Sequence, residues 1–403
     1  MRKPLWLGCA LALACSSSGS LDTTMDAGVA DFAMIDSATP PPERDRDDEP
    51  EPVHEGPLGA ERTLAIGRYI APVLLGRDLR EDEAEQLRSS DGDAWPEVID
   101  GWTGEEGLAR GARRFIERTV RVSGDEARGI DYGMPGRIVE RVARRNLPWG
   151  EILTHGSCVN AEGEDTECDT GAPYTAGILT TRSFLATTVS RFNLGRASAL
   201  AVTFLCEDYP IPSDIQPYLN EEDLIPLFRA NSEEDLEGFD PESVGGLANG
   251  AMCFTCHGQF AAHAQLFVRF DQQGMYQADA TGLQNPDGMP GESFNGLMAS
   301  HMIDELAPLE STQMLGEDVA NLTEAAEVLV AHPEFNRCTV QRMLEETLPL
   351  EPGSLDRDLT ERVRDLLGGA PTYIDFVRET FSYPRLVRTL GDALIQAGGP
   401  SDG

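Results

Sequence analysis

The sequence predicts a mostly α-helical protein built from two helical units with long loops. Apolar residues recur at helical spacing along most of the chain, whereas the alternation typical of strands is scarce. The 403 residues exceed one ordinary domain, since domains hold about 100–200 residues each. Hydrophobic residues make up 40% of the chain, enough for a sizeable core.

The charge balance is strongly acidic. The chain has 32 Lys and Arg against 69 Asp and Glu, a formal net charge of −37. This charge argues against nucleic acids and anionic membrane surfaces as direct partners, because both would be repelled. No apolar run approaches the roughly 20 residues of a membrane span. The acidic excess fits a partner with a basic docking face, or solubility alone.

Residues 1–20 have the order of an export signal: a positive start, a short apolar stretch and small residues at the cut. Ala14-Cys15-Ser16 resembles a lipoprotein cleavage site, at which the cysteine becomes the first mature residue and carries the lipid. We therefore expect lipidation at Cys15 and a place in the cell envelope, on the periplasmic side or at the outer membrane. The lipid would be the only membrane contact. An ordinary cleaved signal is the alternative.

Residues 21–57 are expected to form a disordered tether. They are rich in acidic residues and include the triple proline Pro40–Pro42. Low hydrophobicity and like charges prevent a packed core. Such a tether would hold the folded part away from the membrane.

The first helical unit is expected at residues 58–155. One apolar face runs from Ile66 to Leu74, and Pro72 within it predicts a kink or an early stop. Two further amphipathic helices are rich in arginine and are predicted at Leu108–Val122 and Arg137–Asn146. Their arginines could bind an anion, but more often pair with surplus carboxylates; they are Arg113, Arg114, Arg144 and Arg145.

The second helical unit is expected at residues 174–398. Helical spacing recurs at residues 322–330, 340–348 and 386–394. Loops rich in polar residues, Gly and Pro are predicted at Asn160–Pro173, Ile211–Glu222 and Asp279–Asn295.

The second unit contains the strongest chemical motif of the chain. Cys253-Phe-Thr-Cys256-His257 has the C-x-x-C-H spacing of a c-type haem attachment site. Two thiols at this spacing can reach both vinyl groups on one edge of a porphyrin, and the adjacent imidazole can bind the iron as proximal ligand. We therefore expect a cytochrome c-like helical unit that binds one haem c.

Two other interpretations of the motif remain open. The two cysteines and His257, with His263, could hold zinc, or the cysteines could form a disulfide beside an incidental histidine. The export signal favours haem, because haem c is assembled outside the cytoplasm.

The remaining cysteines are even in number. Of eight cysteines, Cys9 leaves with the signal, Cys15 takes the lipid and two take the haem. An even remainder in an oxidising compartment suggests two disulfides. We expect the pair Cys158 and Cys168, which closes a short polar loop, and the pair Cys206 and Cys338, which joins two distant helices. Buried free thiols are the alternative.

The sixth iron ligand has several candidates. Methionine is a common partner of histidine in electron-transfer cytochromes, and Met275, Met289, Met298 and Met302 follow the motif. We favour Met289, because Gly288-Met289-Pro290 resembles the methionine-bearing loop of small class I cytochromes. His301 or His263 would instead give an iron with two histidine ligands.

Four stretches carry a family resemblance: Asn146–Thr154, Tyr174–Pro212, Cys253–Tyr276 and His332–Leu348. They include a GILT start, the haem-like motif followed by an F-D-x-x-G-x-Y element, and a closing helix with a cysteine. Together they resemble the uncharacterised cytochrome-like families abundant in planctomycetes and myxobacteria. Where those families usually have an Asp-Pro-x-Gly step after the motif, this chain has Ala261, Ala262 and His263. The resemblance implies an exported, mostly helical, c-type cytochrome-like protein and supplies no substrate.

The expected role is one-electron transfer with a redox partner protein. A single attachment motif argues against a dihaem peroxidase. The alternatives are a haem enzyme with an open distal side, where His263 or Arg269 would act, and a non-haem binding protein with zinc or a disulfide at the motif.

Overall fold

The computed structural model describes residues 57–189, 193–224, 251–278, 310–348 and 357–396; within Ala251–Gln265, side chains are described from Cys256 onward. The described residues are mostly helical, which confirms the predicted fold class. Among them no helix is both long enough and apolar enough to cross a membrane.

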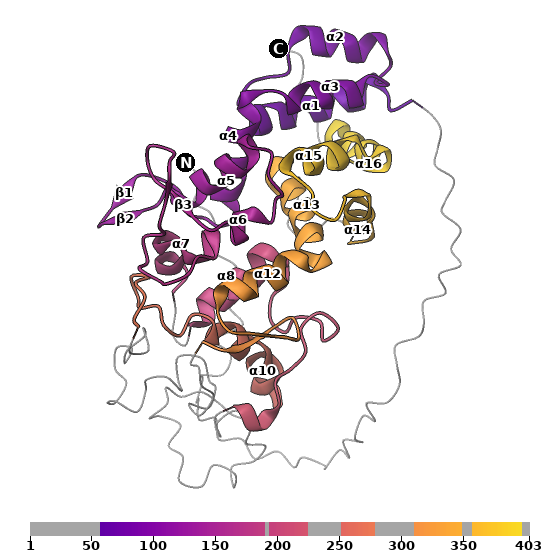
Figure 1. Ribbon diagram of the computed structural model, residues 1–403. Helices are drawn as coiled ribbons and strands as arrows, with labels where there is room; N and C mark the ends of the chain where they lie inside the picture. Colours follow the sequence, from indigo (N-terminus) through magenta and orange to yellow (C-terminus); the bar gives the residue numbers. More distant parts are fainter. Residues whose placement is uncertain (1–56, 190–192, 225–250, 279–309, 349–356, 397–403) are drawn as a thin grey trace, which may run out of the picture. The chain divides into compact units, whose positions relative to one another are not determined.

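The first half of the described chain forms eight helices (Figure 1). They are α1 (Ala60–Leu75), α2 (Glu81–Ser89), α3 (Trp95–Thr103), α4 (Glu106–Thr119), α5 (Met134–Arg144), α6 (Glu151–Thr154), α7 (Arg182–Thr187) and α8 (Leu194–Phe204).

Helices of the second half of the chain pack against those of the first half. Its helices are α10 (Ala251–Gln265), α12 (Leu322–Ala331), α13 (Pro333–Thr347), α14 (Arg357–Leu366), α15 (Tyr373–Ser382) and α16 (Pro384–Gln396). Two 3-10 turns are η2 (Gly177–Thr180) and η4 (Glu221–Asp223).

The described strands form three short antiparallel pairs. Within β3 and β4, Cys158 lies opposite Thr166, so the predicted loop at Asn160–Pro173 begins with a small hairpin. The strands are β1 (Glu126–Ala127), β2 (Ile130–Asp131), β3 (Cys158–Val159), β4 (Asp165–Thr166), β5 (Thr312–Met314) and β6 (Glu317–Val319).

Helix α1 continues through Pro72 and ends at Leu75. Gly76 then takes a left-handed conformation (φ 73°), and its N–H donates to the Pro72 carbonyl at 3.0 Å. Glycine favours this conformation because it lacks a Cβ atom. The early stop predicted from Pro72 is therefore not observed, because the helix continues past the proline to a glycine cap.

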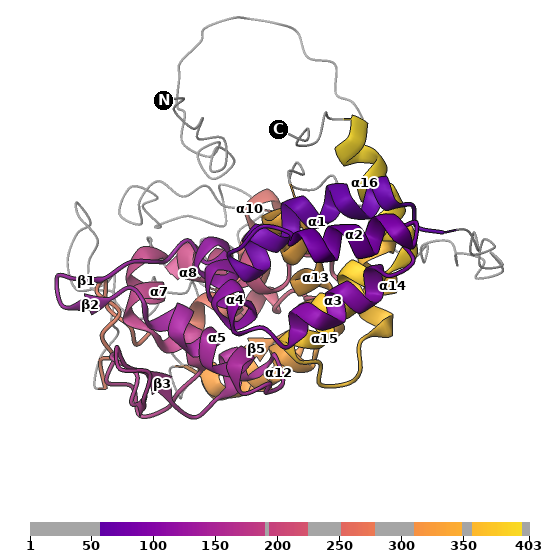
Figure 2. The same ribbon diagram turned by 90° about the horizontal axis from the view of Figure 1, so that it is seen from above.

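The first and last helices of the described chain lie side by side in both ribbon views (Figures 1 and 2). Arg62 of α1 forms an ion pair with Asp392 of α16 at 2.6 Å. Gly391 faces the same contact, since a Cβ atom there would lie 2.5 Å from the Arg62 Cβ. The last described helix, α16, thus packs directly on the first, α1.

One hydrophobic core joins the two halves. Trp149 packs against Tyr373 with ring centroids 5.3 Å apart, and Trp95 donates its indole N–H to the Phe381 carbonyl at 2.6 Å. All four side chains belong to one buried cluster. The helical units expected at 58–155 and 174–398 therefore share a core, and the described residues belong to one compact unit.

Both expected disulfides are present. Cys158 bonds Cys168 with an S–S distance of 2.02 Å, and Cys206 bonds Cys338 at 2.14 Å. The second bond spans 132 residues. On the chain-entropy account, closing so long a loop destabilises the unfolded chain by up to about 5 kcal/mol.

The arginine clusters of α4 and α5 have partners within the protein. Exposed ion pairs of this kind add little stability, about 0–1 kcal/mol each. Carboxylate pairing, the more common interpretation, is confirmed for three of them, and Arg114 binds a carbonyl. The contacts are Arg113–Glu117 at 2.8 Å, Arg144–Glu140 at 2.7 Å, Arg145–Asp165 at 3.8 Å and Arg114 to the Val73 carbonyl at 2.9 Å.

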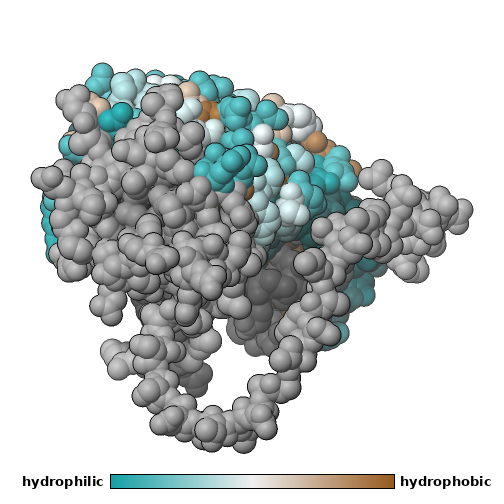
Figure 3. All heavy atoms as spheres, turned by 90° about the horizontal axis from the view of Figure 1, so that it is seen from below, coloured by the Kyte–Doolittle hydropathy of each residue, from teal (hydrophilic) through white to brown (hydrophobic). Residues whose placement is uncertain are grey.

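The surface of the described residues is mostly hydrophilic on the face drawn in Figure 3, with only scattered hydrophobic atoms. This agrees with a chain in which 25% of the residues are charged. Among the described large hydrophobic residues, Tyr218 and Leu366 are exposed.

The contact between α1 and α4 depends on a glycine. A Cβ atom at Gly111 would lie 1.9 Å from the Leu74 carbonyl oxygen. We expect Gly111→Ala to force the helices apart and lower the free energy of unfolding by about 1–3 kcal/mol. Gly101 of α3 is the matched control, because a Cβ there meets nothing within 4 Å. Gly101→Ala should raise stability by up to about 1 kcal/mol. Urea denaturation measures both; equal effects would contradict the close-approach argument.

Candidate functional site

Helix α10 carries the attachment motif. Cys253, Cys256 and His257 all lie within its bounds, and residues three and four apart share one side of a helix. The helix therefore brings the two cysteine positions and the histidine position to one side. This is the placement that a group bonded at both thiols and at the imidazole requires.

His257 lies in an apolar environment. Its ring packs on the Phe260 ring with centroids 4.5 Å apart. Burial lowers the pKa of His257 from 6.5 to about 4, so the imidazole is neutral near pH 7. The neutral form is the one that binds metals. Cys256 is partly buried beside it.

The exposed residue Tyr218 interacts electrostatically with Cys256 of the motif. Its pKa is raised first by partial burial and then by the nearby Cys256. This residue belongs to a loop that sequence reasoning did not connect with the motif.

That loop is residues 207–224, here called the strap. The side-chain amide of Gln259 in α10 donates to the Ile211 carbonyl at 2.7 Å. In return, the Leu219 N–H donates to the Gly258 carbonyl at 2.9 Å. Backbone groups of the strap thus bond to the two residues of α10 that directly follow His257. The predicted loop at Ile211–Glu222 lies within it.

His263 is fully buried on α10. Its Nε2 lies 2.9 Å from the Gln216 Oε1, and its Nδ1 contacts the Tyr209 hydroxyl. Because an amide oxygen only accepts, Nε2 carries the proton and Nδ1 accepts from Tyr209. Both ring nitrogens are thereby engaged, which favours a packing role over the iron-ligand, zinc-ligand and distal-group alternatives. Those alternatives stay predictions.

Arg269, the other candidate distal group, lies in a polar cluster. It pairs with Glu310 at 3.1 Å and donates to the Ala278 carbonyl at 2.6 Å. Glu310 also accepts from the Tyr174 hydroxyl at 2.7 Å and from the Tyr276 hydroxyl at 2.6 Å. Sequence reasoning missed this cluster, because its members are far apart in the chain. The sequence drew attention to Arg269, Tyr276 and the stretch that begins at Tyr174, but nothing in it joined them to one another or to Glu310.

The F-D-x-x-G-x-Y element is a tight turn. Asp271 accepts the N–H groups of Gln273 and Met275 at 2.8 and 2.9 Å. Gly274 has φ 76°, and a Cβ atom there would lie 2.9 Å from the Leu185 Cβ. Met275, one of the sixth-ligand candidates, is half-buried in this turn.

Several expected residues fall outside the described part of the chain. They are Cys15, the signal at 1–20, the tether up to residue 56, Met289, Met298, His301 and Met302, together with the side chain of Cys253. The loop predicted at Asp279–Asn295 also lies there.

Within the described residues, no group of three or more His, Cys, Asp and Glu side chains could hold a metal ion. Neither family models, nor curated proteins, nor solved structures give a match to this chain.

Buried His263 makes stability depend on pH. Burial lowers its pKa from 6.5 to about 4, so the unfolded chain binds a proton before the folded one does. Its contribution to the free energy of unfolding is therefore complete above about pH 6.5. About 3 kcal/mol of that free energy is lost as the pH falls towards 4. We expect His263→Gln to flatten the rise of unfolding free energy between pH 4.5 and 7. Urea denaturation at both pH values measures this; an unchanged slope would exclude the buried neutral histidine as its source.

Proposed function

We propose that this chain is an exported c-type cytochrome-like protein that carries one covalent haem c and transfers single electrons. The observation that supports it most is the placement of the C-x-x-C-H motif along one helix, with a neutral, largely buried His257. The thiols of Cys253 and Cys256 would bond the cofactor, and His257 would bind the iron as proximal ligand.

Apolar residues that follow the motif support the proposal. Phe260, Ala261 and Ala264 are buried on α10, and apolar side chains of this kind would suit the edge of a porphyrin site. When bound, the haem supplies reversible one-electron chemistry. Cys253 and Cys256 would hold it by two covalent bonds, and Phe260 would orient the His257 imidazole. A dry, apolar surrounding is one of the factors that set a haem potential.

The sixth ligand stays a prediction, with Met289 favoured and His301 or His263 as alternatives. An open distal side would make the protein a haem enzyme for peroxide or another small molecule. We also propose a lipid anchor at Cys15, an envelope location, and a redox partner with a basic face. The net charge of −37 supports that last point.

We expect protein made with haem c maturation machinery to be red and to show one haem adduct by intact mass. Cys253→Ala with Cys256→Ala should abolish both, because no thioether can form. Cys158→Ser with Cys168→Ser is the matched control and should leave both unchanged, since that pair bridges a polar loop. A mass spectrum and a reduced visible spectrum of each protein are sufficient.

Further outcomes separate the alternatives. Rapid carbon monoxide binding by the reduced protein would favour an open iron, and Met289→Ala should shift the spectrum only if Met289 is the sixth ligand. Colourless protein without an adduct would overturn the proposal, and bound zinc in that material would favour the zinc site.

A further inference from the structure

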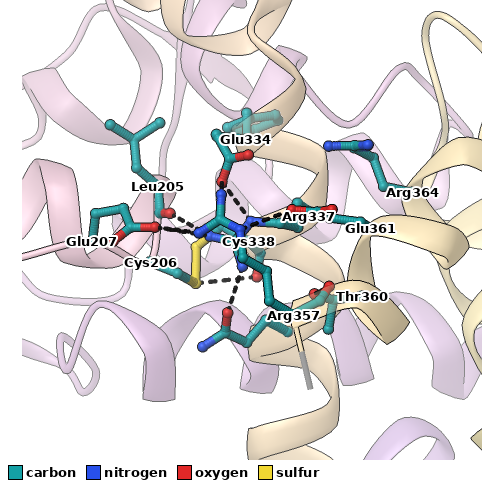
Figure 4. Close-up of polar contacts among 12 residues, drawn as sticks. Leu205, Cys206, Glu207, Glu334, Arg337, Cys338, Arg357, Thr360, Glu361 and Arg364 are labelled. Carbon is teal, nitrogen blue, oxygen red and sulfur yellow. Dashed lines mark hydrogen bonds and ion pairs between the residues drawn. A yellow bond between two sulfur atoms is a disulfide. The ribbon is translucent and has the colours of Figure 1, made fainter. Parts of the chain in front are cut away.

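The C-terminal end of α8 is capped by side chains of α13 (Figure 4). Arg342 donates to the Val202 carbonyl at 2.6 Å, and Arg337 donates to the Leu205 carbonyl at 3.1 Å. The last carbonyls of a helix lack partners within it, and cations are favoured at that end. Side chains of α13 therefore supply partners for carbonyls at the end of α8.

A disulfide lies directly after the capped end of α8 in the chain. Cys206, directly after Leu205, is bonded to Cys338 of α13. Cys206 is partly exposed, whereas Cys338 is buried with 1% exposure. Cys206 also has φ 57°, the left-handed region that residues with a Cβ atom rarely adopt. The disulfide thus holds the chain at the point where it turns into the strap.

Charged side chains surround this link. Glu207, the first residue of the strap, accepts from Arg357 at 2.8 Å and from Arg337 at 3.4 Å. Arg357 also pairs with Glu334 at 2.9 Å. Figure 4 shows these side chains converging beside the disulfide. These ion pairs hold the start of the strap against α13, beside the covalent bond.

The other end of this connection is α10. The strap meets α10 through Gln259, Gly258 and His263, directly after the attachment motif. Gln259 donates a second bond from its amide to the Gln216 carbonyl at 2.6 Å. Hence one short segment joins the disulfide to the motif helix, and it contacts α10 at several points between Tyr209 and Leu219.

We propose that the Cys206–Cys338 disulfide is a thiol-redox latch that regulates how firmly α10 is held. That α10 would hold the cofactor rests on the proposed function; the latch itself does not. A dithiol protein or reagent attacks the sulfur of Cys206, the more exposed of the two cysteines, and Cys338 leaves as a thiol. The second thiol of the reductant then releases Cys206. Two electrons and two protons pass to the cysteines, and the reductant becomes a disulfide. The strap is then held by its hydrogen bonds, its ion pairs and its buried apolar side chains, such as Ile211 and Ile215, without a covalent bond.

The test uses the full chain carrying Cys158→Ser and Cys168→Ser, so that the other described disulfide does not respond. Hydrogen exchange is followed by mass spectrometry before and after dithiothreitol. Reduction should speed amide exchange about tenfold in residues 207–219 and 256–265, because local opening becomes easier. Helix α1, far from the strap in sequence and packed on α16, is the internal reference and should not change.

A second variant guards against incomplete reduction. Cys206→Ser with Cys338→Ser in the same background should reproduce the reduced pattern without reagent. Unchanged exchange in α10 would overturn the latch, and so would equal acceleration in α1, which would indicate general destabilisation. A visible spectrum of the same samples reports on haem separately, so loss of colour and failure of the latch are distinguishable.

Discussion

The end of α8 is the point on which the arrangement of the candidate site depends. Its last carbonyls face α13, where Arg337 and Arg342 donate to them and Cys338 bonds the next residue of the chain. Helix ends need such partners because their final carbonyls have none inside the helix. This contact holds the start of the strap against α13, and the strap in turn bonds to α10.

A second constraint is the polar chemistry of α10 itself. Its two described histidines lie six residues apart and serve different ends. His257 has an aromatic neighbour and a neutral ring suited to a metal. His263 is surrounded by Tyr209 and Gln216, which use both of its nitrogens. A buried polar group must be hydrogen-bonded or it destabilises the fold. The strap supplies those bonds and so aligns the helix.

The sequence predicted local features well. The helical spacing at 322–330 corresponds to α12, and the arginine-rich helices correspond to α4 and α5 within a few residues. Both expected disulfide pairings are confirmed. They could be proposed because the four remaining cysteines allow few pairings. The two expected helical units, by contrast, share a core through Trp149 and Tyr373. Apolar periodicity identifies a buried face but not the element that covers it.

The sequence by itself determined the helical class and the single motif that suggests a haem, because each depends on spacing along the chain. It suggested the cysteine pairs, which the tertiary structure then brought together. The tertiary structure decided the rest. It placed the strap on α10, assigned His263 to Tyr209 and Gln216, and gathered Tyr174, Tyr276 and Glu310 around Arg269. These contacts join residues that are distant in sequence. Burial and hydrogen bonding, rather than local spacing, select such partners.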